Sequence, residues 1–520
     1  MNKHIAMFFG LVAAVNAVGE GLDTNDLFAN ALAGKTTGIR YWSGAQSGMT
    51  LPSPLAWDPF GAPAAGDTLY INSTAPAALV AGESVSVTRM FVGSGSRWNE
   101  STQSVDLNSA YDLGARLDVT GGNLTVADRL DVGGGHADNS NAVMTVSGGA
   151  SVFVGGLYMG DCASNNGKSN ALTISNATFT IGGTGESRIA NYNGGTAFIN
   201  VLKDGSFMSK STLFFGSGDA KMTIDGGQAE FQANETLIGT SSANRSGTVE
   251  VKAGELLTKT LQIGRDNGNG VLALSGGHTV VSNAAWYGTF NLGWAGSGKL
   301  KMSDDADLKV YDGPLAVART SSGKGVVEMT GGTIDVVNNS VTIGFERNGD
   351  TGDMSEGSWT MTGGSVVANE INVGGGGLGE MLVAGGTVTS RGWFWIGRNT
   401  YAEGKLKVSN AELTSTYGVV VGSSGSGELE LLNGNYANLQ NIYVPYDPGV
   451  GVLKVGEGAT LSGSYIELGR ASGGRGMLEV NGGEIDSTHN FTMANAEGSV
   501  CSMTVNGGRA KFGDDFYVSQ

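Results

Sequence analysis

Cysteine, histidine and charged residues are all scarce in this chain of 520 residues. Only two cysteines and four histidines occur, and the histidines are scattered without the spacing of metal ligands, so no histidine-based metal centre is predicted. Charged residues make up only 15% of the chain, yet apolar residues still reach 40%. Because disordered chains are poor in apolar residues, this composition excludes intrinsic disorder and predicts a packed core.

Long hydrophobic runs are absent after the N-terminus, where no segment approaches 18 continuous apolar residues. The sequence therefore predicts no transmembrane helix in the mature chain. The first 20 residues, MNKHIAMFFGLVAAVNAVGE, combine a weakly basic start, an apolar stretch from Ile5 to Ala14 and a small-residue cleavage site at 15–17. This arrangement predicts a signal peptide over residues 1–17 and an exported protein.

Basic residues are fewer than acidic ones, 31 against 48, and the net charge is −17. Nucleic acids and anionic membrane surfaces attract basic patches, so neither is predicted as a partner. The acidity instead favours solubility of an extended secreted protein.

Glycine, in contrast, is abundant: it supplies 87 of the 520 residues, where roughly 7% is usual. The glycines do not recur at every third position, which excludes collagen. Together with many β-branched residues, they predict short strands joined by tight turns.

The glycines belong to a repeat of the form L-x-V-x-G-G, present in sixteen exact or looser copies about 26 residues apart. The first residue of each pair stands at position 121, 148, 176, 204, 226, 253, 276, 304, 331, 363, 385, 410, 433, 457, 482 and 507. A second repeated position, an apolar residue followed by a small one as in Ile343-Gly344, lies between successive pairs. A polar loop of variable length follows it and accounts for the uneven spacing.

Each copy contains three short segments in which apolar and polar residues alternate, as in VEMTGGTIDVVNNSVTIG over residues 327–344. Alternation with period two is typical of strands, and one such unit cannot bury its apolar side alone. The sequence thus predicts an all-β fold, a single-stranded parallel β-helix (β-solenoid) of about 16 coils of ~25 residues with three strands per coil. The crossover rule favours a right-handed helix.

The predicted organisation is a signal peptide (1–17), an N-terminal cap region (18–65), the first irregular coils (66–114) and the solenoid repeats (115–520), which end in mid-coil. The glycine pairs are interpreted as coil corners, where the backbone needs φ > 0 or close stacking. Cys162 and Cys501 would then lie ~60 Å apart at a rise of ~4.8 Å per coil, so two unpaired thiols are predicted.

The unit L-x-V-x-G-G-x-hydrophobic … I-G-x-x-x-x-G-x-G resembles the repeat of type V autotransporter passengers and of PEP-CTERM-sorted surface proteins. The Trp-rich stretches YWSG (41–44) and WDPFGAPAAGDTLYIN (57–72) are similar to the start of such arrays. The resemblance covers about residues 40–520 and implies a non-enzymatic exported surface protein, associated with the outer membrane or extracellular, that acts as an adhesin or structural stalk. It also implies a right-handed helix.

The sequence departs from this family because it contains neither an outer-membrane barrel nor a sorting helix with a basic tail. We therefore expect that Gln520 is not the natural end and that any membrane attachment runs through a missing C-terminal anchor. The expected partners are surface polysaccharides or molecules of a host or neighbouring cell.

The main alternative is a carbohydrate-binding or polysaccharide-degrading β-helix protein, a lyase or hydrolase. Paired carboxylates can act as acid and base, and Asp304, Asp305 and Asp307 form such a cluster. However, the first two occupy a corner, and no Ser–His–Asp grouping is predicted from the repeat, so no catalytic residue is assigned. A pure scaffold that assembles side by side is a third interpretation.

No cofactor or metal site is predicted either. The acidic loops at 264–270 and 348–353, the latter with Asp350 and Asp353, offer oxygen ligands for weak calcium binding. They lack the nonapeptide calcium repeat, which favours solvated turns.

The candidate binding residues are aromatic. In RGWFWIG the alternation places Phe394 and Ile396 inward and Trp393 and Trp395 outward. Two further aromatic residues point outward from the same strand position two and three coils later, namely Tyr443 and Tyr465. Exposed aromatic rings offer rigid apolar area with polar tips, so these four predict a site for sugar rings or a protein partner.

Overall fold

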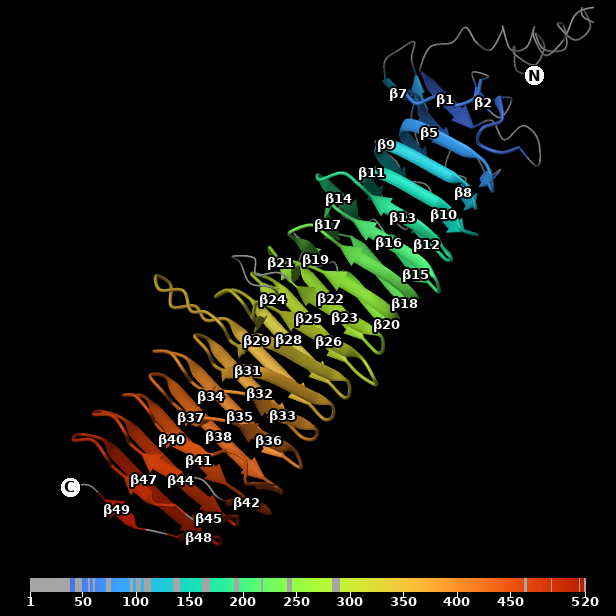
Figure 1. Cartoon of the computed structure of the whole chain (residues 1–520). Helices are drawn as coiled ribbons and strands as arrows, with labels where there is room; N and C mark the ends of the chain where they lie inside the picture. The colour runs from blue at the N-terminus through green and yellow to red at the C-terminus, as the bar shows by residue number, and fades with distance from the viewer. Residues whose placement is uncertain are drawn as a thin grey trace, which may run out of the picture.

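A computed structural model describes residues 38–42, 49–54, 57–58, 61–71, 76–93, 97–99, 104–106, 114–133, 141–160, 169–190, 196–216, 218–240, 246–282, 290–462, 465–487, 489–513 and 515–518. These residues form one long rod, with the N-terminal strands at one end and the C-terminal strands at the other (Figure 1). The rod is a parallel β-solenoid, as predicted. The proposed signal peptide at 1–17 lies outside the described residues.

Each coil presents three faces, called the first, second and third face in chain order. The strands of the first face are β4 (Ala77–Val80), β8 (Ala115–Thr120), β10 (Ala142–Ser147), β12 (Ser169–Ile174), β15 (Thr196–Leu202), β18 (Asp219–Phe231), β20 (Ser246–Thr258), β22 (Asn269–Leu274), β25 (Ser297–Met302), β28 (Lys324–Met329), β30 (Glu356–Met361), β32 (Leu378–Val383), β35 (Glu403–Ser409), β38 (Ser426–Leu432), β41 (Val450–Val455), β44 (Arg475–Asn481) and β47 (Val500–Asn506). Of these, β18 and β20 continue onto the second face.

The other strands of the second face are β5 (Ser84–Val92), β9 (Asn123–Val132), β11 (Ser151–Met159), β13 (Ala177–Ile181), β16 (Gly205–Ser209), β23 (His278–Ser282), β26 (Asp307–Tyr311), β29 (Thr333–Ile343), β31 (Ser365–Val373), β33 (Thr387–Ser390), β36 (Glu412–Ser415), β39 (Gly434–Tyr436), β42 (Ala459–Ser462), β45 (Glu484–Ser487) and β48 (Arg509–Phe512). Five of them, β5, β9, β11, β29 and β31, run on into the third face.

The separate strands of the third face are β1 (Ile39–Trp42), β3 (Thr68–Ile71), β14 (Glu186–Ile189), β17 (Thr212–Phe215), β19 (Thr236–Thr240), β21 (Leu261–Arg265), β24 (Phe290–Trp294), β27 (Leu315–Val317), β34 (Trp393–Ile396), β37 (Gly418–Val421), β40 (Asn441–Val444), β43 (Tyr465–Leu468), β46 (Phe491–Met493) and β49 (Phe516–Val518). Two short antiparallel pairings complete the set: β2 (Trp57–Asp58) with β1, and β6 (Arg97–Asn99) with β7 (Ser104–Asp106).

Most equivalent strands of successive coils pair in parallel, so that Val327 of β28 lies between Leu300 of β25 and Trp359 of β30. On the second face, β39, β42, β45 and β48 form a separate four-stranded sheet. The inward residues of all three faces form one continuous apolar core. In the coil at 327–344, all six alternating apolar residues are at most 1% exposed, which confirms the predicted inward face. No helix long and apolar enough to span a bilayer occurs in the described ranges.

The first corner, between the first and second faces, is where the glycine pairs lie. At each of the sixteen predicted pairs at least one residue has φ between +42° and +92°. Five of these are not glycine, and all five are the short polar residues that tolerate a left-handed backbone: Asn176, Asp204, Asp304, Asn410 and Asn433. The interpretation of the glycine pairs as corners is confirmed.

The third corner, where a coil leaves the third face, is the second repeated position. Gly344 has φ +67° here, and an added Cβ would lie 2.2 Å from the carbonyl oxygen of Leu378. Opposite this corner, ten glycines from Gly247 to Gly476 stack in register in the first-face strands. The backbone of the corner thus approaches the first-face sheet too closely for side chains.

The N-terminal end of the core is closed by Trp42 and Trp57, whose rings meet edge to face at 5.3 Å. The Trp57 indole N–H donates to the carbonyl of Leu51 at 2.7 Å. Next to them, Arg40 and Asp67 form a buried ion pair. At the other end Cys501 is a free thiol, as predicted, while Cys162 lies outside the described residues.

Candidate functional site

The four predicted aromatic residues all lie on the outer side of the third face. Trp395 stacks between Asn372 and Val420, and Val420 precedes Tyr443 in the same column. Trp393 and Tyr465 belong to the neighbouring outward column, where they pair with Gly418 and Asn441. The intervening Phe394 and Ile396 are fully buried. The predicted orientation of this strand is therefore confirmed.

The structure brings the four residues into one aromatic cluster with two more, Tyr417 and Tyr446. Trp393 is the centre of the cluster. Its ring centroid lies 5.8 Å from that of Trp395, 6.2 Å from Tyr417, 6.0 Å from Tyr443 and 6.5 Å from Tyr446. Tyr465 joins the far end of the cluster at 6.4 Å from Tyr443.

Part of this cluster is covered by residues that directly follow the third corner. Arg398 lies over the Trp395 ring at 4.8 Å, and Arg470 lies over Tyr446 at 4.4 Å and Tyr443 at 4.9 Å. The same layer exists in earlier coils, where the Arg319 guanidinium packs on Phe345 at 3.7 Å and burial lowers the pKa of Arg319.

This cover explains why outward residues of the third face are buried. Asn372, Val420 and Glu467 are at most 3% exposed, and the indole nitrogen of Trp395 is buried without a hydrogen-bond partner. The Tyr465 hydroxyl lies 3.2 Å from Thr492 Oγ1, and burial raises the pKa of Tyr465. Trp395 and Tyr465 are therefore packing residues as much as surface residues.

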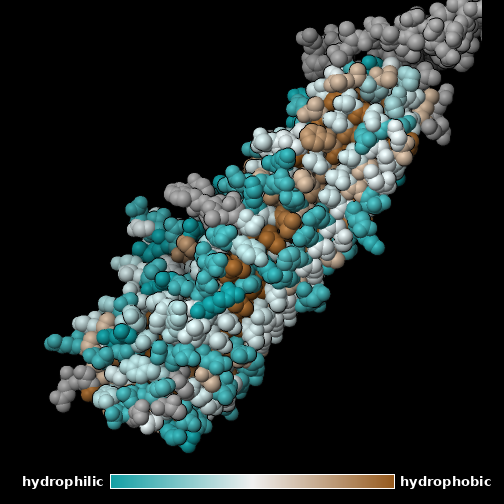
Figure 2. Space-filling view, viewed as in Figure 1, coloured by the Kyte–Doolittle hydropathy of each residue, from teal (hydrophilic) through white to brown (hydrophobic). Residues whose placement is uncertain are grey.

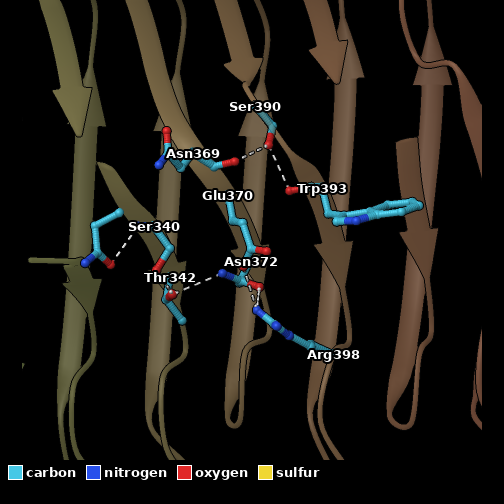
Figure 3. Close-up of polar contacts among 9 residues, drawn as sticks. Ser340, Thr342, Asn369, Glu370, Asn372, Ser390, Trp393 and Arg398 are labelled. Atoms are coloured by element: carbon cyan, nitrogen blue, oxygen red, sulfur yellow. Dashed lines mark hydrogen bonds and ion pairs between the residues drawn. The ribbon is translucent and has the colours of Figure 1, made fainter. Parts of the chain in front are cut away.

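Trp393, in contrast, borders an open groove of about 520 Å³ at the second corner, between the second and third faces. The other lining residues come from four successive coils: Asn338, Asn339, Ser340, Asn369, Glu370, Arg391, Gly392 and Tyr417. Tyr417 is 58% exposed. Figure 3 shows the Trp393 ring extending toward the next coil.

Gly418 creates the room that Trp393 needs. It follows Tyr417 at the second corner with φ +135°, and an added Cβ would lie 3.1 Å from the Trp393 ring. The same Cβ would lie 2.4 Å from the carbonyl oxygen of Asn441, so a side chain at this position would clash with that backbone atom first and would also press on the Trp393 ring.

The charged groups of the groove are held in ion pairs. Arg398 Nη1 donates to Glu370 Oε2 and to Asn372 Oδ1, both at 2.9 Å (Figure 3). Arg391 Nη2 lies 2.8 Å from Asp335 Oδ1. The groove wall is further fixed by Ser390, whose hydroxyl donates to the carbonyl of Trp393 at 2.8 Å. The groove therefore combines aromatic rings, amides and neutralised charges on a rigid sheet.

Tyr417, Tyr446 and the arginines could not be found from the alternation of apolar and polar residues, because they lie in turns. The only sequence signal is positional. Arg398, Tyr446 and Arg470 each follow the small residue of the third corner, which places them in one stacked column.

The acidic cluster at Asp304, Asp305 and Asp307 is divided by the fold. Asp304 takes the left-handed corner conformation, with φ +52°. Asp307 lies on the outer second face, where its Oδ2 is 2.6 Å from His278 Nδ1 and its Oδ1 accepts from Thr333 at 2.8 Å. The repeat therefore does bring a histidine and an aspartate together, which the sequence did not predict.

In the described part of the chain, no group of three or more His, Cys, Asp or Glu residues could hold a metal ion. In the 348–353 loop, Asp353 Oδ2 accepts from Thr351 at 2.7 Å. Weak calcium binding by this loop, the less favoured of the two interpretations, stays untested.

No protein-family model matches the chain, and no curated protein matches it. One similar solved structure is the TibC-catalysed hyper-glycosylated TibA55-350 fragment, with 14% identity over 85% of this chain and 97% of that one and a TM-score of 0.26. The solenoid fold is established by the parallel strand pairing described above.

Proposed function

We propose that this protein is a non-enzymatic exported surface protein whose solenoid acts as an adhesin-like rod. The observation that carries the proposal is the groove beside Trp393, which presents aromatic rings and amides on a rigid sheet. On the face shown in Figure 2, hydrophilic and intermediate residues predominate toward the C-terminal end, whereas hydrophobic residues form a stripe toward the N-terminal end.

The rod geometry supports a role in reach and display. Each coil adds ~4.8 Å, so the coils between Ala115 and the groove hold it tens of ångströms from the N-terminal end. Stacked coils contact only their neighbours, which lets a repeat protein extend without a larger core. This arrangement supports the proposal of a stalk that carries a binding surface far along its length.

Surface exposure is tested with intact cells that produce the protein. External proteinase should degrade the chain before lysis, whereas a cytoplasmic marker should survive. Protection of the chain until the cells are lysed would overturn the proposed location.

Adhesion is tested by retention of the purified full chain on immobilised polysaccharides and on DNA. We expect retention on at least one polysaccharide and none on DNA, because the net charge is −17. If no polysaccharide retains the chain and it instead associates with itself as concentration rises, the scaffold interpretation replaces this one.

A further inference from the structure

We infer that the groove beside Trp393 binds an uncharged oligosaccharide that lies along the rod axis, with sugar rings against Trp393 and Tyr417. This inference rests on the proposed adhesin-like function and names the ligand class of the same site. It follows from the shape of the groove, its rings and its charge.

The shape sets the direction of the ligand. The lining residues come from four successive coils, contributed by residues 338–340, 369–370, 391–393 and 417. At ~4.8 Å per coil this is a length of ~14 Å along the axis. A groove of about 520 Å³ with this length accommodates an oligosaccharide segment rather than a single sugar.

The rings set the kind of contact. Trp393 and Tyr417 stand 6.2 Å apart with their planes inclined at 62°, so they offer two differently tilted apolar surfaces. A pyranose has a face of C–H groups and a rim of hydroxyls, which matches a rigid ring bordered by polar groups. Gly418 leaves space beneath Trp393, and the Ser390 hydroxyl fixes its backbone.

The charge selects against acidic ligands. Glu370 is bound by Arg398 and Arg391 by Asp335, so these four groups sum to zero and no cation among the lining residues is left for a carboxylate or sulfate. Besides the aromatic residues, the uncharged polar side chains are the amides of Asn338, Asn339 and Asn369 and the hydroxyl of Ser340. Amides and hydroxyls both donate and accept, as a sugar hydroxyl requires.

The polar lining also argues against a protein partner. Docking surfaces for proteins have a largely apolar centre with a polar rim. In this groove two aromatic residues accompany seven residues that are polar, charged or glycine.

The experiment uses affinity electrophoresis of the full chain in gels that contain one polysaccharide each, either neutral or acidic. The wild type should be retarded by a neutral polysaccharide, and the retardation should not weaken as ionic strength rises. Trp393→Ala and Tyr417→Ala should each weaken binding roughly tenfold or more, because each removes a stacking surface.

Tyr401→Ala is the matched control. Tyr401 is 63% exposed and packs on Arg347 at 4.4 Å, but it is not part of the groove. Its replacement should leave retardation unchanged. Trp395→Ala is unsuitable because it opens the covered layer. Trp393 also packs against four rings, so Tyr417→Ala decides the test if Trp393→Ala lowers the unfolding midpoint, because Tyr417 is 58% exposed.

Three outcomes would contradict the inference in different ways. Retardation by no polysaccharide would overturn the adhesin-like function along with it. Retardation by acidic polysaccharides alone, lost in salt, would preserve that function but overturn the ligand class. Retardation by neutral polysaccharides that Trp393→Ala and Tyr417→Ala leave intact would overturn the site.

Discussion

Tyr436 is the residue in which burial has its clearest chemical consequence. Its side chain is 1% exposed, and its hydroxyl donates to the carbonyl of Leu432 at 2.6 Å. Burial raises the pKa of Tyr436 from 10.0 to about 12. Because the folded-state pKa is the higher one, the unfolded chain loses this proton first as the pH rises.

The resulting prediction concerns stability in alkali. The contribution of Tyr436 to the free energy of unfolding should be complete below pH 10 and be lost between pH 10 and about 12, at no more than ~1.4 kcal/mol per pH unit. Urea unfolding across this window, compared between wild type and Tyr436→Phe, measures it. The variant should decline less steeply, and equal slopes would show that Tyr436 titrates normally.

The direction of a side chain can be predicted from the sequence where the period-two alternation of a strand alone determines it. Alternation was sufficient to place Phe394 inward and Trp393 outward, because successive side chains of a strand point to opposite sides. It could not show that Arg398 folds back over Trp395, because this contact depends on a turn. A side chain that points outward from a strand of this fold is therefore not always exposed to solvent.

The stacked glycines are the feature that matters most at the element scale. In β35, an added Cβ at Gly404 would lie 2.1 Å from the carbonyl oxygen of Val373 and 2.4 Å from the nitrogen of Gly397. Both neighbours are backbone atoms, so neither can move without disturbing a coil. The sheet and the third corner are therefore in direct backbone contact.

Gly404→Ala should accordingly lower the free energy of unfolding by roughly 1–3 kcal/mol, the usual cost of overpacking. The matched control is Gly349→Ala in a surface loop, where an added Cβ would meet no atom within 4 Å. The control should change stability by no more than ~0.5 kcal/mol. Denaturant midpoints measure both, and equal effects would contradict the backbone contact.

Elements were also predictable to different degrees. The first and third corners could be predicted because each has its own small residue, whether Gly, Asn or Asp at the first or Gly and Ala at the third. The second corner has no small residue that recurs from coil to coil. In β29 the chain even passes through this corner within one continuous strand, from Thr333 to Ile343. The groove lies at this corner, so sequence reasoning identified one groove residue, Trp393, and missed the groove itself.

The whole molecule is a one-dimensional array, in which each coil contacts only its neighbours. A destabilising substitution in one coil should therefore affect only that coil and its neighbours. Trp359 in β30 is 1% exposed in the core, and Trp359→Ala should cost ~3–5 kcal/mol.

Hydrogen exchange measures how far this damage spreads. Trp359→Ala should speed the exchange of backbone amides in β28, β30 and β32, which pair directly, while β10 and β12 should keep their protection. Trp359→Phe is the control, since it keeps a ring and removes an indole N–H that has no partner. Faster exchange throughout the rod would show that the coils unfold as one unit.

The most direct test of the central claim, a rigid rod that presents a neutral-glycan groove, is a crystal structure of the full chain with a neutral oligosaccharide that it binds. The expected result is a sugar chain along the rod axis, with rings against Trp393 and Tyr417 and hydroxyls near Asn338 and Asn369. A sugar chain bound to another face, with the Trp393 groove empty, would contradict the claim.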